Sequence, residues 1–172
     1  GGDAYSPDLG DLARIALLDR DPAAVDARQV DRRDRSRDVE RNVVRPGQHF
    51  SLNDVLGKRT PERGFVEAPQ IMRGRLEDAV GGGVSQIATT TYNAAFFAGV
   101  QIVAHQPHEF YISRYPMGRE ATVSWGGPEL IFRNDWPAAL LIKLTATDSS
   151  ITVSMFSRRL GRRVKTTTGE PY

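Results

Sequence analysis

The sequence predicts an α+β domain in which one central helix packs on a mostly antiparallel β-sheet. Residues 86–98 have small and apolar side chains at helical spacing, and a glycine follows them. After this segment come short runs rich in β-branched and aromatic residues, separated by Pro, Gly, Asn and Asp at hairpin spacing. The chain has 172 residues, of which 40% are hydrophobic, so it is long enough for one compact domain with a core.

The N-terminal residues 1–42 predict a helical or mobile arm. Residues 6–21 are expected to contain a short helix, because Pro7 suits a first helical position and leucines recur on one apolar face. In residues 19–41 acids and arginines balance, which favours a solvated helix or mobile arm over a segment that docks on a partner.

The folded domain is expected over residues 43–157, followed by a basic tail over residues 158–172. The helix over 86–98 should be buried, and Gly99 should end it. Asp148 and Ser149 predict a hairpin turn. Six runs are expected to be strands: 100–105, 109–115, 120–125, 129–134, 139–147 and 150–157.

Composition excludes several classes of protein. The chain has no cysteine, which excludes disulfides, thiolate metal sites and a cysteine nucleophile. Its formal net charge of +2 is too small to indicate a nucleic-acid partner. No run of 18 or more apolar residues occurs, so no transmembrane segment is expected.

No cofactor or metal ion is predicted. The glycines at 81–83 are not followed by a lysine-serine pair and do not fit G-x-G-x-x-G. A zinc site from His105, His108 and Glu109 is disfavoured, because residues i and i+3 of an extended chain tend to face opposite sides.

The stretch "GGGVSQ", residues 81–86, contains two features, the three glycines and Ser85, and each of them allows two interpretations. The glycines could form a tight buried turn, or they could leave amide N–H groups free to hold an oxyanion. Ser85 could be the N-cap of the helix or a nucleophile. A serine nucleophile needs a base within hydrogen-bond reach, and a histidine of "AHQPHEF", residues 104–110, is the plausible source.

Three long segments resemble the VanW domain family: "RPGQHFSLNDVLGKRTPERGFVEAPQIMRG", "AVGGGVSQIATTTYNAAFFAGVQIVAHQPHEFYISRYPMGREATVSW" and "ELIFRN". The family is named for an accessory protein of glycopeptide-resistance clusters. It is found in bacterial cell-envelope proteins, often beside peptidoglycan-binding modules. The resemblance therefore implies an extracytoplasmic location and cell-wall chemistry.

Some members of the family are regarded as L,D-transpeptidases, which join stem peptides through a thioester on a cysteine. Ser85 stands at the cysteine position of the family's G-G-G-V-C-Q motif. His108 matches a motif histidine, and Glu120 matches the aspartate of a D-A-T-V run. Two origins of the serine stay open: a natural variant of an actinobacterial kind, which the arginine-rich composition suits, or an engineered replacement.

The resemblance implies roles for these residues in two alternatives. In an enzyme, Ser85 attacks a peptide carbonyl, His108 is the base, Glu120 or Asn134 orients the imidazole, and the amides of residues 83–86 hold the oxyanion. In a binding module, the same cleft holds a wall peptide without cleaving it. The residues expected to contact the peptide are Gly81, Gly82, Gly83, Gln86, Arg114 and Arg119.

The predicted function is recognition of peptidoglycan stem peptides with a vestigial or weak L,D-transpeptidase-like site. The alternatives are an active L,D-transpeptidase or peptidase that uses Ser85, or a cysteine at this position in the native protein, and a purely structural envelope module. Anionic wall polymer is a second candidate partner, which the basic residues 157–165 would contact.

Overall fold

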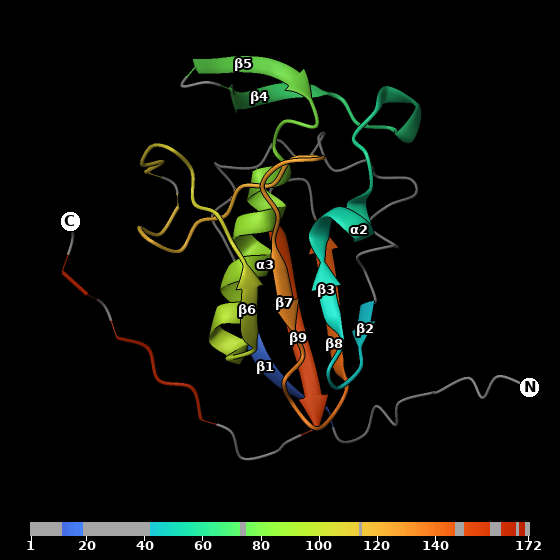
Figure 1. The fold of residues 1–172 in the computed structure, drawn as a ribbon, viewed down its shortest axis with the longest axis vertical. Helices are drawn as coiled ribbons and strands as arrows, with labels where there is room; N and C mark the ends of the chain where they lie inside the picture. Colours follow the sequence, from blue (N-terminus) through green and yellow to red (C-terminus); the bar gives the residue numbers. More distant parts are fainter. Residues whose placement is uncertain are drawn as a thin grey trace, which may run out of the picture.

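A computed structural model of the chain describes residues 12–18, 42–72, 75–113, 115–146, 150–158, 163–167 and 169–170. This part of the chain forms one long helix and three antiparallel sheets, and the helix packs against the largest sheet, as Figure 1 shows. The predicted α+β class is therefore confirmed. No helix among the described residues is long and apolar enough to cross a membrane.

The largest sheet has four antiparallel strands in the order β1-β9-β8-β2. Along β8, buried residues at 140, 142 and 144 alternate with more accessible ones, so one face of this sheet enters the core. Its strands are β1 (Leu12–Leu18), β2 (Asn42–Val44), β8 (Leu140–Ala146) and β9 (Ile151–Arg158).

The helix predicted over residues 6–21 is wrong for residues 12–18, which form strand β1. An apolar run of this length fits a strand as well as a helix, and periodicity alone does not separate them. The free edge of β9 decides between them, because it supplies backbone partners along the whole of β1, from Leu12 opposite Arg158 to Leu18 opposite Val153. The remaining residues of the predicted arm before residue 42 lie outside the described ones.

A second sheet has the order β3-β7-β6, and a third pairs β4 with β5. Phe50 of β3 stacks on Phe132 of β7 with ring centroids 4.7 Å apart. The elements outside the large sheet are β3 (His49–Ser51), α2 (Leu52–Leu56), the 3-10 helix η4 (Pro61–Arg63), β4 (Glu67–Met72), β5 (Arg75–Val80), β6 (Gln101–Ala104) and β7 (Ile131–Arg133).

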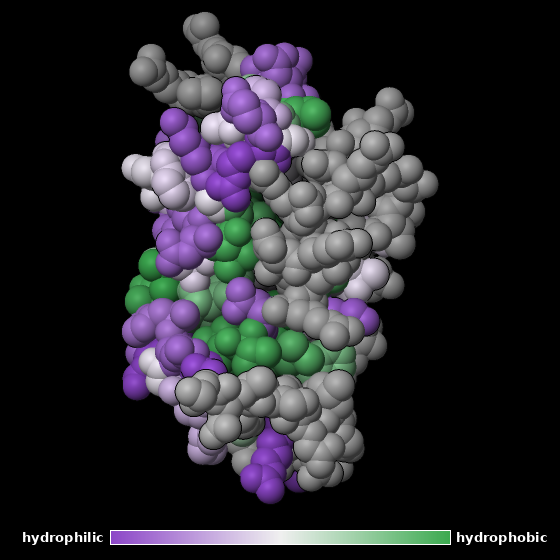
Figure 2. Space-filling view, turned by 90° about the vertical axis from the view of Figure 1, so that its right-hand side faces the viewer, coloured by the Kyte–Doolittle hydropathy of each residue, from purple (hydrophilic) through white to green (hydrophobic). Residues whose placement is uncertain are grey.

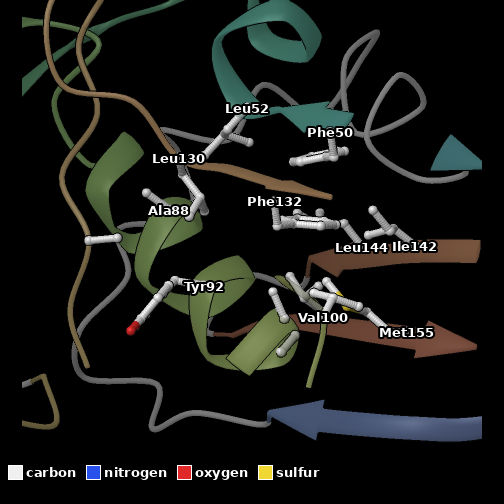
Figure 3. Close-up of a cluster of buried hydrophobic side chains, with 14 of the residues drawn as sticks. Phe50, Leu52, Ala88, Tyr92, Val100, Leu130, Phe132, Ile142, Leu144 and Met155 are labelled. Carbon is white, nitrogen blue, oxygen red and sulfur yellow. The ribbon is translucent and has the colours of Figure 1, made fainter. Parts of the chain in front are cut away.

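Helix α3 (Val84–Ala98) confirms the predicted central helix. Most of its residues are buried, and it packs against β1 and β9. Small side chains such as Ala88, Ala94 and Ala95 let neighbouring elements approach it closely. The helix ends at Gly99, which has the left-handed backbone that the prediction of a glycine stop requires. Figure 3 shows the core between α3 and the strands, with Phe132 at its centre.

Four of the six predicted strands are confirmed, at 100–105, 129–134, 139–147 and 150–157. The register of β8 on β9 confirms the hairpin, while its turn at residues 147–149 lies outside the described residues. The runs 109–115 and 120–125 are not strands where the structure describes them. In the first run Tyr115 N–H closes a turn onto Ile112 O, and in the second Thr122 N–H donates to Gln106 O without forming a regular strand. Side chains of α3 bind the segment 119–121, as described below.

The face seen in Figure 2 is partly apolar. Apolar residues gather in its middle, between more hydrophilic residues above and below. This view looks from the side of Figure 1 on which β2, the last strand of the large sheet, lies. The loops that carry the site residues described next lie on the opposite side, beside α3 and β6.

Candidate active site

The three glycines before α3 each meet a requirement of the backbone. Gly81 and Gly83 have φ of 90° and 80°, a region that disfavours other residues. Gly82 lies against β4, where an added Cβ would stand 2.1 Å from the carbonyl oxygen of Ala68. The interpretation of this segment as a tight turn is therefore supported at every glycine.

The amides of the turn fall into two groups. Three of them donate to carbonyl oxygens inside the protein: those of Gly81, Gly82 and Gln86. The amides of residues 83–85 have no acceptor among the described residues. The first N–H groups of a helix lack partners within it and carry its positive dipole end. Any oxyanion at this turn is therefore restricted to the amides of residues 83–85, a narrower set than the expected 83–86.

Ser85 is not the N-cap of α3, which corrects one of the two interpretations of this residue. The N-cap is Gly83, and no side chain caps this end of the helix. Ser85 lies two positions further along, is half-buried, and its hydroxyl has no hydrogen-bond partner among the described residues. The helix start therefore leaves the Ser85 hydroxyl uncommitted.

His108 and Glu120 form a buried pair. His108 Nδ1 and Glu120 Oε2 are 2.8 Å apart, and the two side chains are only 6% and 8% exposed. The imidazole also stacks on Tyr115, with ring centroids 5.4 Å apart. A carboxylate only accepts hydrogen bonds, so His108 Nδ1 donates to it and Nε2 is the nitrogen left to accept a proton. This is the arrangement in which a carboxylate orients a histidine base.

Asn134 does not orient His108, so this alternative is wrong. Its amide nitrogen donates to Val44 O at 2.7 Å and to Ala138 O at 2.9 Å, and its Oδ1 accepts from Trp136 N–H at 3.0 Å. Asn134 is fully buried and ties the turn after β7 to β2. All its hydrogen bonds serve the fold.

His105 contacts the backbone of Glu120. Its Nε2 is 2.5 Å from the carbonyl oxygen of Glu120, and its ring stacks on Tyr92 with centroids 3.9 Å apart. His105 is thus a satisfied histidine, and it contacts the residue that holds His108. Burial raises the pKa of the Tyr92 phenol, and the positive charge of Arg119 partly opposes this rise.

Arg119 does not extend freely into solvent. Its Nη1 donates to Asn93 Oδ1 at 2.9 Å, and its guanidinium lies 4.9 Å from the centre of the Phe97 ring. Asn93 follows Ser85 by eight residues, which corresponds to about 12 Å along a helix axis. Arg119 is therefore about two turns of α3 away from the serine. Arg114, the other arginine expected to bind a peptide, lies outside the described residues.

Ser85 lies on the same side of α3 as the residues that contact the segment carrying Glu120. Ser85, Thr89 and Asn93 are spaced by four residues and so lie on one side of the helix. Thr89 contacts the backbone of Ala121, the residue after Glu120. No hydrogen bond joins Ser85 to His108 among the described residues. The structure brings Glu120 to His108 and directs the Ser85 side of α3 toward their segment.

The side chain of Gln86 is 5% exposed and points its amide nitrogen to Thr90 Oγ1 at 3.3 Å. Its Oε1 is buried and has no hydrogen-bond partner within the described part of the chain. Across the described ranges, no group of three or more His, Cys, Asp or Glu side chains converges as a metal site would require.

The family model for VanW like protein matches residues 28–156, a range that contains Ser85, His108 and Glu120. The chain belongs to the VanW-like family. It is also 40% identical over 119 residues to the uncharacterized protein YoaR of Bacillus subtilis (strain 168). The match covers 69% of this chain and 39% of YoaR, so the chain spans about two fifths of that relative. No solved structure gives a significant match.

The membership confirms the resemblance noted in the sequence. The matched range begins at residue 28, before the expected domain start at residue 43. Residues that sequence reasoning did not single out for the site are Thr89, Tyr92 and Asn93. The available signal for Thr89 and Asn93 was two polar side chains four residues apart in a largely buried helix, since buried polar groups require partners.

Proposed function

We propose that this VanW-like domain binds peptidoglycan stem peptides in the cell envelope, outside the cytoplasm, at a weak or vestigial L,D-transpeptidase-like site. The observation that carries the proposal is the buried pair of His108 and Glu120, joined at 2.8 Å. Such a pair is costly to bury without a role, and it leaves one imidazole nitrogen available for proton transfer. The free amides at the start of α3 and the uncommitted Ser85 hydroxyl support the same site.

The chemistry of this site would be acyl transfer. The Ser85 hydroxyl oxygen attacks the carbonyl carbon of a stem peptide while its proton passes to His108 Nε2. The carbonyl oxygen becomes an oxyanion, which the amides of residues 83–85 stabilise. The tetrahedral intermediate then expels the amine, which takes the proton from His108, and an ester remains on Ser85. An acceptor amine or water breaks this ester by the reverse proton path.

Weak activity or simple binding is favoured over full turnover because of two features. No hydrogen bond joins Ser85 to His108 among the described residues, whereas a serine hydroxyl needs a base within reach. The dipole of α3 would lower the pKa of a thiol at residue 85 but activates a hydroxyl little. Fully active transpeptidation or peptidolysis by Ser85 is the alternative, since such contacts tighten when substrate binds.

A structural envelope module is the other alternative, and one observation favours it. Each glycine of the 81–83 turn is required by the backbone, so the motif has a structural reason without any ligand. Binding separates the two views. Isothermal calorimetry with a disaccharide-tetrapeptide should give saturable binding if the site recognises stem peptides. No heat of binding at millimolar ligand would favour the structural module.

Arginine variants test how the peptide is held. Arg119→Ala should weaken binding about 10- to 150-fold, because a charge-assisted hydrogen bond contributes roughly 1.5–3 kcal/mol. Arg133→Ala is the matched control, since Arg133 is exposed on β7 and contacts Gly47 O and Gln101. Equal weakening by both variants would indicate general charge attraction and count against a specific carboxylate contact.

Binding of anionic wall polymer by the basic tail also stays a proposal. Arg158, Arg163 and Lys165 are exposed, which suits contact with a polyanion. Such binding should weaken steeply with salt. Binding that does not change between low and high salt would exclude this contact.

A further inference from the structure

Two buried polar side chains of α3 use their hydrogen bonds on the segment that carries Glu120. Thr89 and Asn93 are fully buried, one helical turn apart. Polar groups inside a core are destabilising unless they are hydrogen-bonded. Their partners therefore show what these residues hold in place.

Thr89 binds the backbone of Ala121 in both directions. Its hydroxyl donates to Ala121 O at 3.1 Å and accepts from Ala121 N–H at 3.0 Å. Asn93 binds both the backbone and the side chain of Arg119. Its amide nitrogen donates to the backbone Arg119 O at 2.6 Å, and its Oδ1 accepts from the side-chain Nη1 of Arg119. The residues on both sides of Glu120 are thus fixed to the helix.

Glu120 itself is held from the other side. The His105 ring contacts the Glu120 carbonyl oxygen and is stacked on Tyr92 of α3. With residues 119, 120 and 121 each bound, the position of the Glu120 carboxylate is set, and its Oε2 meets His108. No regular strand performs this task, since residues 119–121 lie in a loop.

We propose that Thr89, Asn93 and His105 are positioning residues that fix Glu120, and through it His108, relative to the start of α3. Ser85 precedes Thr89 by one turn on the same helix, about 6 Å along the axis. The helix therefore sets both the nucleophile position and the carboxylate that orients the base. The part of this inference that concerns Ser85 rests on the function proposed above, and the part that concerns Glu120 and His108 does not.

Thr91 provides a matched control inside the same helix. It is also fully buried, but its hydroxyl has no hydrogen-bond partner among the residues that the structure describes. Thr89→Val and Thr91→Val each replace a buried hydroxyl by a methyl group of similar size. Only Thr89→Val removes bonds to the segment that carries Glu120. Thr89→Ser keeps the hydroxyl and should rescue the contact.

The test is the NMR signal of the His108 Nδ1 proton in protein with labelled histidine. A proton held in a buried hydrogen bond to a carboxylate exchanges slowly and resonates far downfield, and Glu120→Gln identifies it by shifting it. We expect Thr89→Val to broaden or abolish this signal, and Thr91→Val and Thr89→Ser to retain it. An unchanged signal in folded Thr89→Val protein would overturn the inference. If Thr89→Val does not fold, His105→Phe keeps the stacking on Tyr92, removes the bond to Glu120 O, and is judged by the same signal.

A second measurement separates this inference from the proposed function. In a Ser85→Cys background, Thr89→Val should slow alkylation of the thiol by iodoacetamide at least about tenfold, since small displacements of a catalytic group have effects of this size. A lost His108 signal with an unchanged alkylation rate would uphold the positioning of Glu120 and reject the proposed role of residue 85. An unchanged signal rejects the positioning whatever the rate.

Discussion

The two ends of α3 are both formed by glycine, yet they differ in how their backbone groups are satisfied. At the C-terminal end, Gly99 N–H donates to Phe96 O at 3.0 Å and Val100 N–H donates to Ala95 O at 3.3 Å. At the N-terminal end, Gly83 offers no side chain to cap the helix, and the amides of residues 83–85 have no acceptor among the described residues.

This difference indicates what each end contributes. The C-terminal end is closed by the usual glycine motif, which stabilises the helix and starts β6 two residues later. The N-terminal end lacks the Ser, Thr, Asp or Asn that would contribute about 1 kcal/mol as a cap. Its free amides are instead suited to a negatively charged ligand group. The C-terminal backbone groups are thus satisfied within the helix and its cap, and we interpret the N-terminal end, whose amides stay free within the described part of the chain, as the ligand end.

The largest expected effect is at the turn before α3. Gly82→Ala should lower the free energy of unfolding by about 3 kcal/mol, because the new methyl group would collide with the Ala68 carbonyl. Urea denaturation measures this loss. A loss below about 1 kcal/mol would mean that the turn does not pack tightly on β4.

A smaller loss is expected at the closed end. Gly99→Ala places a side chain at φ of 67°, which costs about 1–2 kcal/mol for a residue other than glycine. Its Cβ would also stand 2.6 Å from Val164 Cγ2, so one of the two side chains would have to shift. A melting temperature equal to that of the unchanged protein would contradict the left-handed C-cap.

Ser85→Ala should change stability little, by less than about 0.5 kcal/mol, since Ser85 caps nothing. Ser51→Ala is the control, because the Ser51 hydroxyl accepts from Asp54 N–H at 3.0 Å and does cap α2. That variant should lose about 1 kcal/mol. If denaturation curves show that Ser85→Ala lowers the free energy of unfolding as much as Ser51→Ala does, then Ser85 has a structural role that its observed contacts do not explain.

The smallest effect is expected in the middle of α3 and only at alkaline pH. Burial raises the pKa of Tyr92, so the folded state favours the neutral phenol. Its contribution to stability is fully present below pH of about 10, the pKa of an unfolded tyrosine, and is lost as pH rises through the folded-state value. Tyr92→Phe should therefore flatten the loss of stability above pH 10, measured by urea denaturation at each pH. If the stability of Tyr92→Phe falls above pH 10 as steeply as that of the unchanged protein, groups other than Tyr92 cause the loss.

Local sequence signals predicted those parts of the fold that local physics determines. The spacing of small residues and the following Gly99 were sufficient for α3, and β-rich runs separated by turn residues were sufficient for β8 and β9. The strand at residues 12–18 was mistaken for a helix because its partner, β9, is remote in the chain. The run 120–125 was mistaken for a strand because side chains of α3, also remote, bind residues 119–121. The run 109–115 was mistaken for one although it ends in a turn, in which Tyr115 N–H donates to Ile112 O.

The candidate site divides in the same way. Ser85, His108 and Glu120 were identified from motif resemblance, which reports on positions far apart in the chain. The N-cap role of Ser85 was wrong because the left-handed Gly83 starts the helix two residues earlier. His105, Thr89 and Asn93 act through tertiary contacts, and spacing alone does not reveal their partners.

The central claim is that the start of α3 and the His108–Glu120 pair form one acyl-transfer-type site, and the pH dependence of a thiol at residue 85 tests it most directly. Ser85→Cys should react with iodoacetamide along a titration curve with a pKa below the usual 8.5, because the helix dipole and a nearby imidazolium stabilise the thiolate. Adding His108→Ala should move that pKa back toward 8.5 and slow the reaction at neutral pH. A thiol that titrates near 8.5 with or without His108 would contradict the claim.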